Sequence, residues 1–147
     1  MKKIITNLSL LLVLIISSNL RMHAQTNDWQ PIYLLVTGAN TMEGVEASFQ
    51  LNTCNGEDVI YVKFINHNEY AVKLEWFDGV FSQELKWVNK EQAGDKKSIT
   101  LAAKAEAKGT CLNNSHPELV VKVKDFVASK KDVKRYSSSQ LMIVPVK

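Results

Sequence analysis

The sequence has 147 residues, of which 46% are hydrophobic and 22% are charged, and its formal net charge is +3 at pH 7. Lys2, Lys3 and Arg21 account for that whole excess, so the rest of the chain carries equal numbers of basic and acidic side chains. The basic character of the full sequence is therefore no evidence for nucleic acid or an anionic membrane surface as partner, and no nucleic-acid partner is predicted.

Residues 1–24 have the layout of a secretory signal peptide. Lys2 and Lys3 precede an apolar run over 8–16, and Ala24 stands before a polar segment. The apolar run is too short to span a bilayer, and no comparable run follows it. The Met-Lys-Lys opening is typical of bacteria. We therefore expect a bacterial periplasmic or extracellular protein without a transmembrane segment, in which 25–147 form a single domain.

Two cysteines, Cys54 and Cys111, follow the predicted leader. Thiols in an exported protein meet oxidants, so a single disulfide is expected. It would close a loop long enough to stabilise the fold by about 4 kcal/mol in the chain-entropy model.

The first predicted strand is a short N-terminal edge strand over 31–36. Pro31 stands at its start, where a missing N–H donor is tolerated. Gly38, Asn40 and Gly44 then mark a turn before the next strand.

Asn55-Gly56 predicts a hairpin between strands 45–54 and 57–66. Both residue types accept positive φ, as a two-residue hairpin turn requires. The turn places Phe49 opposite Val62, and alternation along each strand marks both residues as inward.

Asp78-Gly79 has the same chemistry and predicts a second hairpin, between strands 70–77 and 80–88. Trp76 would face Phe81, Tyr70 would face Trp87, and Gly79 would hold positive φ.

In the C-terminal third, residues 98–108 are predicted as a strand because Ile99 and Leu101 alternate with polar neighbours. The alternative is a helix, since 102–108 consists largely of strong helix formers. A strand over 119–128, a polar connection over 129–139 and a closing strand over 141–146 follow. Pro145 indicates that the closing strand lies at a sheet edge.

Seven or eight short strands predict an all-β fold, a sandwich of two antiparallel sheets. The strand order resembles that of immunoglobulin-like and fibronectin type III-like domains. In that resemblance strands A, B, C, C′, E, F and G are 45–54, 57–66, 70–77, 80–88, 98–108, 119–128 and 140–147. Antibody-type domains join strands B and F by a disulfide, whereas Cys54 is at the A–B tip and Cys111 is in the E–F loop. The resemblance implies that these two connections share one end of the sandwich, so that they can be bridged.

The predicted function is a non-enzymatic binding or adhesion module for a protein or carbohydrate. No Ser or Cys stands in a nucleophile motif near a histidine, so no catalytic residue and no cofactor is predicted. The alternative is an exported metal-binding protein, because Cys54, His67, Cys111 and His116 form a complete ligand set for zinc. Their spacing in the sequence does not support a metal site, since no two of them form a closely spaced ligand pair. A small secreted hydrolase is the third possibility.

Two predicted sites compete for the binding role. Loops commonly carry binding residues, and the loops 67–69, 89–97 and 129–139 are expected at one end of the sandwich. The residues expected to bind there are His67, Asn68, Glu69, Lys131 and Arg135. The alternative is a sheet-face interface, because outward-facing aromatic and aliphatic residues leave apolar surface. These residues are Tyr61, Ile65 and Phe77.

Overall fold

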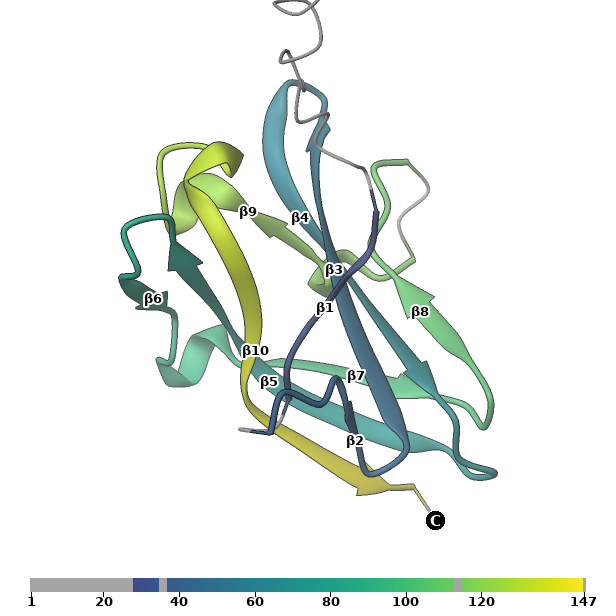
Figure 1. Cartoon of the computed structure of the whole chain (residues 1–147). Coiled ribbons are helices and arrows are strands. Elements are labelled where there is room, and N and C mark those ends of the chain that lie inside the picture. Colours follow the sequence, from purple (N-terminus) through teal and green to yellow (C-terminus); the bar gives the residue numbers. More distant parts are fainter. Residues whose placement is uncertain (1–27, 35–36, 113–114, 147) are drawn as a thin grey trace, which may run out of the picture.

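The computed structural model describes residues 28–34, 37–112 and 115–146. The predicted signal peptide, 1–24, lies outside the described residues. Those residues form ten strands in two antiparallel sheets (Figure 1), which confirms the predicted two-sheet all-β sandwich. None of the described segments is a helix long and apolar enough to cross a membrane.

The first sheet is built on the hairpin of β3 (Val45–Cys54) and β4 (Glu57–Asn66). Short strands extend it on both sides. β1 (Gln30–Pro31) and β2 (Thr41–Met42) pair with β3, while β8 (Glu106–Lys108) and β9 (Val120–Lys122) pair with β4. Of the predicted N-terminal edge strand over 31–36, Pro31 is in β1 and 32–34 are not in a strand, while 35–36 lie outside the described residues.

The second sheet is centred on β5 (Val72–Ser82), which β10 (Val133–Pro145) accompanies along its whole length. Two shorter strands pair with the other edge of β5. They are β6 (Trp87–Asn89) and β7 (Lys97–Leu101). Single turns of 3₁₀ helix connect the strands. These turns are η1 (Ala93–Asp95), η2 (Pro117–Leu119), η3 (Val123–Asp125) and η4 (Lys130–Asp132).

The predicted first hairpin is confirmed in turn and in register. Asn55 and Gly56 have φ values of 51° and 81°, so both occupy the left-handed region that the two-residue turn requires. Phe49 pairs with Val62, and both side chains are buried.

The predicted second hairpin is wrong, because Asp78 and Gly79 lie inside the continuous strand β5. Tyr136 Oη and Trp76 Nε1 donate hydrogen bonds to Asp78 Oδ1 over 2.6 and 3.2 Å, and Lys97 Nζ lies 2.7 Å from Asp78 Oδ2. These partners satisfy a buried carboxylate that would be solvated in a turn.

The register drawn from that turn is wrong as well. Phe81 pairs with Trp87, so Trp76 does not face Phe81, and Tyr70 precedes the strand. Gly79 does not have the positive φ that the turn would have required.

The C-terminal segments depart from their predictions because the chain changes sheets. Residues 98–108 are neither one strand nor a helix, since β7 lies in the second sheet and β8 in the first. Lys104, with φ at 58°, turns the chain between them. The segment 119–128 contains the last residue of η2, then β9 and η3. Because β9 pairs with β4, the segment matched to strand F lies beside B rather than C.

The predicted polar connection over 129–139 is wrong, because it contains η4 and the first half of β10. Val133 and Tyr136 are buried in this half-strand, and Tyr136 packs against Phe49 of the other sheet with ring centroids 6.1 Å apart. Phe64 and Trp76 make a second contact between the sheets, at 5.1 Å. The two contacts join the sheets through large, fully buried side chains, which contribute strongly to core stability.

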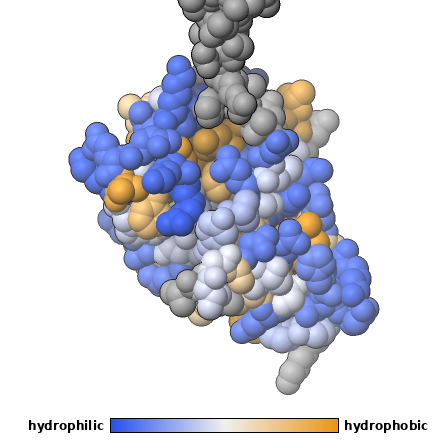
Figure 2. Space-filling model, in the orientation of Figure 1, coloured by the Kyte–Doolittle hydropathy of each residue, from blue (hydrophilic) through white to orange (hydrophobic). Residues whose placement is uncertain are grey.

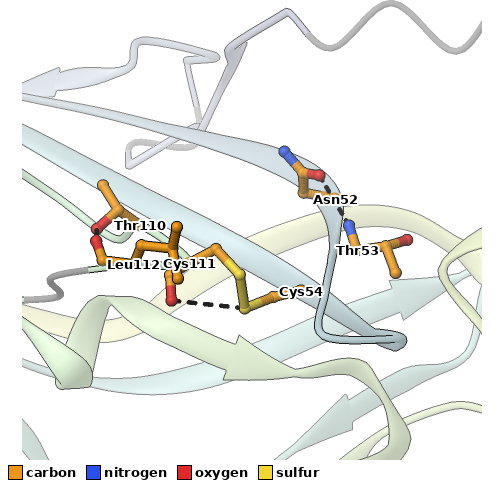
Figure 3. The surroundings of a disulfide bond; sticks show 6 residues. All are labelled: Asn52, Thr53, Cys54, Thr110, Cys111 and Leu112. Carbon is orange, nitrogen blue, oxygen red and sulfur yellow. Dashed lines mark hydrogen bonds between the residues drawn. A yellow bond between two sulfur atoms is a disulfide. The ribbon is translucent and has the colours of Figure 1, made fainter.

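The predicted disulfide between Cys54 and Cys111 is present, with the two Cα atoms 5.4 Å apart (Figure 3). It ties the end of β3 to the segment that follows β8. Thr110 Oγ1 donates a hydrogen bond to the Leu112 carbonyl over 2.9 Å, which folds this segment around Cys111. The bond makes both thiols unavailable as ligands, so the zinc site built on Cys54, His67, Cys111 and His116 is wrong.

Candidate functional site

The residues of the predicted binding end do not share one end of the sandwich. Lys130 donates its backbone N–H to Asp58 Oδ2 over 2.9 Å, which places Lys130 and its neighbour Lys131 at the start of β4. His67 follows the last residue of β4. A strand of this length spans about 30 Å, so the prediction of a single loop end is wrong.

The turn 67–69 is held by its own local contacts. His67 Nε2 lies 3.1 Å from Glu46 Oε2, Asn68 Nδ2 donates to the Glu43 carbonyl over 2.9 Å, and Glu69 pairs with Lys104 at 2.6 Å. These contacts join the segment after β4 to β3, to the β2–β3 turn and to the turn between β7 and β8, and they account for the three residues as structural.

The predicted sheet-face interface is covered. Tyr61 is 6% exposed and Phe77 is 9% exposed, while Ile65 is half-buried. Tyr61 lines a shallow hollow together with Trp29, which precedes β1. Burial raises the pKa of the Tyr61 hydroxyl above its usual value. The expectation that these side chains leave apolar surface is therefore wrong.

One predicted residue, Arg135, does lie in an exposed aromatic surface, which we call the Arg135 cluster. The cluster consists of Tyr33, Phe81, Leu85, Trp87 and Arg135. The guanidinium carbon of Arg135 is 4.6 Å from the ring centroid of Phe81 and 6.0 Å from that of Tyr33. The rings of Phe81 and Trp87 are 4.7 Å apart. A cation and three aromatic rings therefore form a continuous row.

Arg135 points outward because its neighbour Tyr136 is fixed inward. Side chains alternate along a strand, and Tyr136 is fully buried with its hydroxyl bonded to Asp78. Burial, together with the nearby Asp78 charge, raises the pKa of Tyr136 well above its usual value, so the hydroxyl stays protonated and remains a donor. Arg135 pairs with Phe81 across the sheet, which places the guanidinium against that ring.

The indole of Trp87 occupies the space that a side chain at Gly79 would fill. Phe81 and Trp87 are directly paired between β5 and β6. A Cβ on Gly79 would meet Trp87 Cη2 at 2.0 Å, closer than any ordinary contact. The absent side chain of Gly79 thus lets the indole lie across β5.

Leu85 completes the cluster from the turn between β5 and β6. Its φ is 62°, a conformation that is uncommon for a bulky side chain, and 65% of its surface is exposed. Backbone hydrogen bonds hold the turn, from Ser82 N–H to the Lys86 carbonyl and from Leu85 N–H to the Ser82 carbonyl. Strained residues of this kind collect at binding and catalytic sites.

Two grooves, of about 360 and 560 Å³, share Tyr33, Phe81 and Arg135 as lining residues. The first groove is also lined by Gln30, Pro31, Phe49, Leu85 and Lys134. The second also touches Leu34, Gly38, Tyr136 and Ser137. Strands β1 and β10 lie toward the viewer in Figure 1, and the same view in Figure 2 shows hydrophobic surface between hydrophilic side chains. The cluster therefore stands between two hollows of the size of small ligand pockets.

Sequence reasoning identified Arg135 but none of its cluster neighbours. Their meeting depends on the pairing of Phe81 with Trp87, and the turn that sets this pairing, 83–86, contains no Gly, Asn or Asp. Tyr33 comes from the segment that follows β1, far from Phe81 and Arg135 in the sequence, so no local pattern encodes this contact. The sequence does place several aromatic residues on either side of 83–86, and this is the signal from which the cluster could have been predicted.

Comparisons with known proteins give a fold likeness only. No family model and no curated protein matches the chain. A solved structure that resembles it is that of a DUF1425 family member from Shewanella sp. pv-4. The two chains are 13% identical, the likeness covers 67% of this chain and 75% of the other, and the TM-score is 0.42. A likeness of this extent assigns neither a family nor a function.

Proposed function

We propose that the protein is an exported, non-enzymatic binding module that recognises a protein partner through the Arg135 cluster. The observation that carries the proposal is the exposed row formed by Tyr33, Arg135, Phe81 and Trp87. Trp, Tyr and Arg are the residue types that dominate the binding energy of protein interfaces. Their rigid rings offer large contact areas at a low entropic cost.

The backbone supports these side chains without burying them. Tyr33 is 47% exposed and Trp87 is 39% exposed, so both contribute less to the core than their size allows. The open position at Gly79 and the positive φ of Leu85 both serve to place exposed residues. Local features that cost stability and present apolar surface are expected at a binding site.

A protein partner is favoured over a carbohydrate by the aliphatic residues of the smaller groove. Pro31 and Leu85 line it beside the rings of Phe49 and Phe81. A carbohydrate site needs several polar groups that fix hydroxyls, whereas this lining is largely apolar.

Export is supported by the signal-peptide pattern of 1–24 and by the disulfide between Cys54 and Cys111. Disulfides persist in oxidising compartments and are rare in the cytosol. The proposed place of action is therefore the periplasm or the exterior of a bacterial cell.

Affinity capture from the cell envelope of the natural host tests the proposal. The bait is the exported protein with its disulfide intact, compared with Tyr33→Ala and Trp87→Ala variants. Met142→Ala is the matched control, because Met142 is exposed and apolar but outside the cluster. We expect one partner to be retained by the wild type and the control and lost by both cluster variants. Retention by the cluster variants would contradict the proposal.

A further inference from the structure

We infer that the partner presents an acidic polypeptide segment, in which a carboxylate pairs with Arg135 and Lys134 and an adjacent apolar side chain enters the smaller groove. This inference rests on the proposed function, and it specifies the chemistry that the Arg135 cluster recognises. It follows from the charges around the groove, the geometry of Arg135 and the shape of the lining.

The basic residues beside the cluster differ from most of the lysines elsewhere on the surface. Most other described lysines form ion pairs, such as Lys73 with Glu75 at 2.7 Å, and Lys63 lies over the Trp29 ring. Lys131, Lys134 and Arg135 are exposed, and no carboxylate among the described residues lies within 4.0 Å of their charged groups. Residues 131–135 contain these three basic side chains and one carboxylate, Asp132, which bonds to Ser129, so the segment has a net charge of +2.

The smaller groove is electrostatically one-sided. Among the described residues, its lining includes Lys134 and Arg135 and no acidic side chain. Glu84 lies in the adjacent turn, but it pairs with Lys86 at 2.6 Å, so the turn adds no net charge. A surface of one sign attracts a partner of the opposite sign and speeds its association.

Arg135 is placed to bind a carboxylate with two hydrogen bonds. Its guanidinium carbon lies 4.6 Å from the centroid of the Phe81 ring, a cation–π contact that restrains the group. The N–H groups lie in the guanidinium plane, so they remain available at its edge for a carboxylate. Pro31, Phe49 and Leu85 line the groove beside it and provide an apolar site for a neighbouring side chain.

A peptide display library tests this chemistry without knowledge of the natural partner. Random twelve-residue peptides are selected on the folded, disulfide-bonded protein. We expect selected sequences to contain acidic residues next to Leu, Ile, Phe or Trp. We also expect a synthetic copy of the most enriched peptide to bind at least about tenfold more weakly to the Arg135→Glu and Lys134→Glu variants. Lys108→Glu is the control, since it makes the same charge change on β8, and it should bind as the wild type does.

Reversing the charge of both basic residues tests the inference more directly. Selection on the Lys134→Glu/Arg135→Glu double variant should replace acidic by basic residues in the enriched peptides, and thermal melting will show that the variant is folded. Peptides that are neutral, or that stay acidic on the reversed surface, would overturn the inference. Absence of any enriched peptide would overturn it too. In each of these cases the proposed function is judged separately by capture of the native partner, which does not depend on peptide charge.

Discussion

The indole of Trp87 lies over Gly79 so closely that a Cβ at Gly79 would meet Trp87 Cη2 at 2.0 Å. This contact explains why glycine stands in the middle of a strand, where its conformational freedom usually destabilises. It also links the fold to the candidate site, because the position of Trp87 depends on it.

Gly79→Ala should therefore destabilise the protein by about 1 to 3 kcal/mol, the usual cost of overpacking. The effect should nearly vanish in a Trp87→Ala background, because the clash is then absent. Chemical denaturation of the two single variants and the double variant measures this coupling. Additive effects would show that the cost of Gly79→Ala does not arise from contact with Trp87.

Leu85→Gly should leave the stability unchanged or raise it by up to about 1 kcal/mol. Glycine adopts positive φ without the steric penalty that Leu85 bears, although its unfolded state is more flexible. Partner capture by this variant should nevertheless fall, because an exposed apolar contact is lost. Equilibrium unfolding and capture are measured on the same preparation. A loss of stability above about 1 kcal/mol would mean that the leucine side chain supports the fold.

Removal of the disulfide by Cys54→Ala and Cys111→Ala should lower stability by about 4 kcal/mol, since the bond closes a loop of 57 residues. The β3–β4 register should survive, because the Asn55-Gly56 turn sets it. The wild-type protein, denatured after export, should contain no titratable thiol. Thiol titration and denaturant unfolding check both expectations, and two free thiols in the exported protein would contradict them.

Tyr136→Phe should reduce the loss of stability at alkaline pH. The pKa of Tyr136 is raised in the folded state, so its contribution is complete below the unfolded value of about 10 and is lost as the pH rises above it. In that range the wild type should lose about 1.4 kcal/mol per pH unit more than the variant. Near neutral pH the variant should be about 1 to 3 kcal/mol less stable, because Asp78 loses a hydrogen-bond donor. Unfolding curves at a series of pH values give both numbers.

Asn55-Gly56 and Asp78-Gly79 show how far the sequence predicts this fold. The first dipeptide forms the predicted turn, with both residues at the positive φ that its local preference indicates. The second has the same local preference, but the partners of Asp78 include Lys97 and Tyr136, which are far along the chain. Local chemistry could not show that these residues satisfy the carboxylate inside a sheet.

The candidate site was harder to predict than the fold, because its residues also meet through contacts that are distant in the sequence. Arg135 was named from its charge and from a loop that proved to be a strand. Its partner Phe81 is on β5 and its partner Tyr33 is in the segment after β1, so they meet only once the chain has folded. The exposed sheet face was mispredicted likewise, because alternation marks Tyr61 as outward but does not show that the chain around Trp29 covers it.

Site-specific photocrosslinking in the natural host tests most directly whether the Arg135 cluster is the binding surface. A benzophenone amino acid replaces Leu85 or Trp87 in the cluster. It replaces His67 or Val144 as exposed controls elsewhere on the molecule. We predict that a single protein is crosslinked from Leu85 and Trp87 and not from the controls, and that Arg135→Glu abolishes the crosslink. Crosslinking from His67 or Val144, with none from Leu85 or Trp87, would contradict the account.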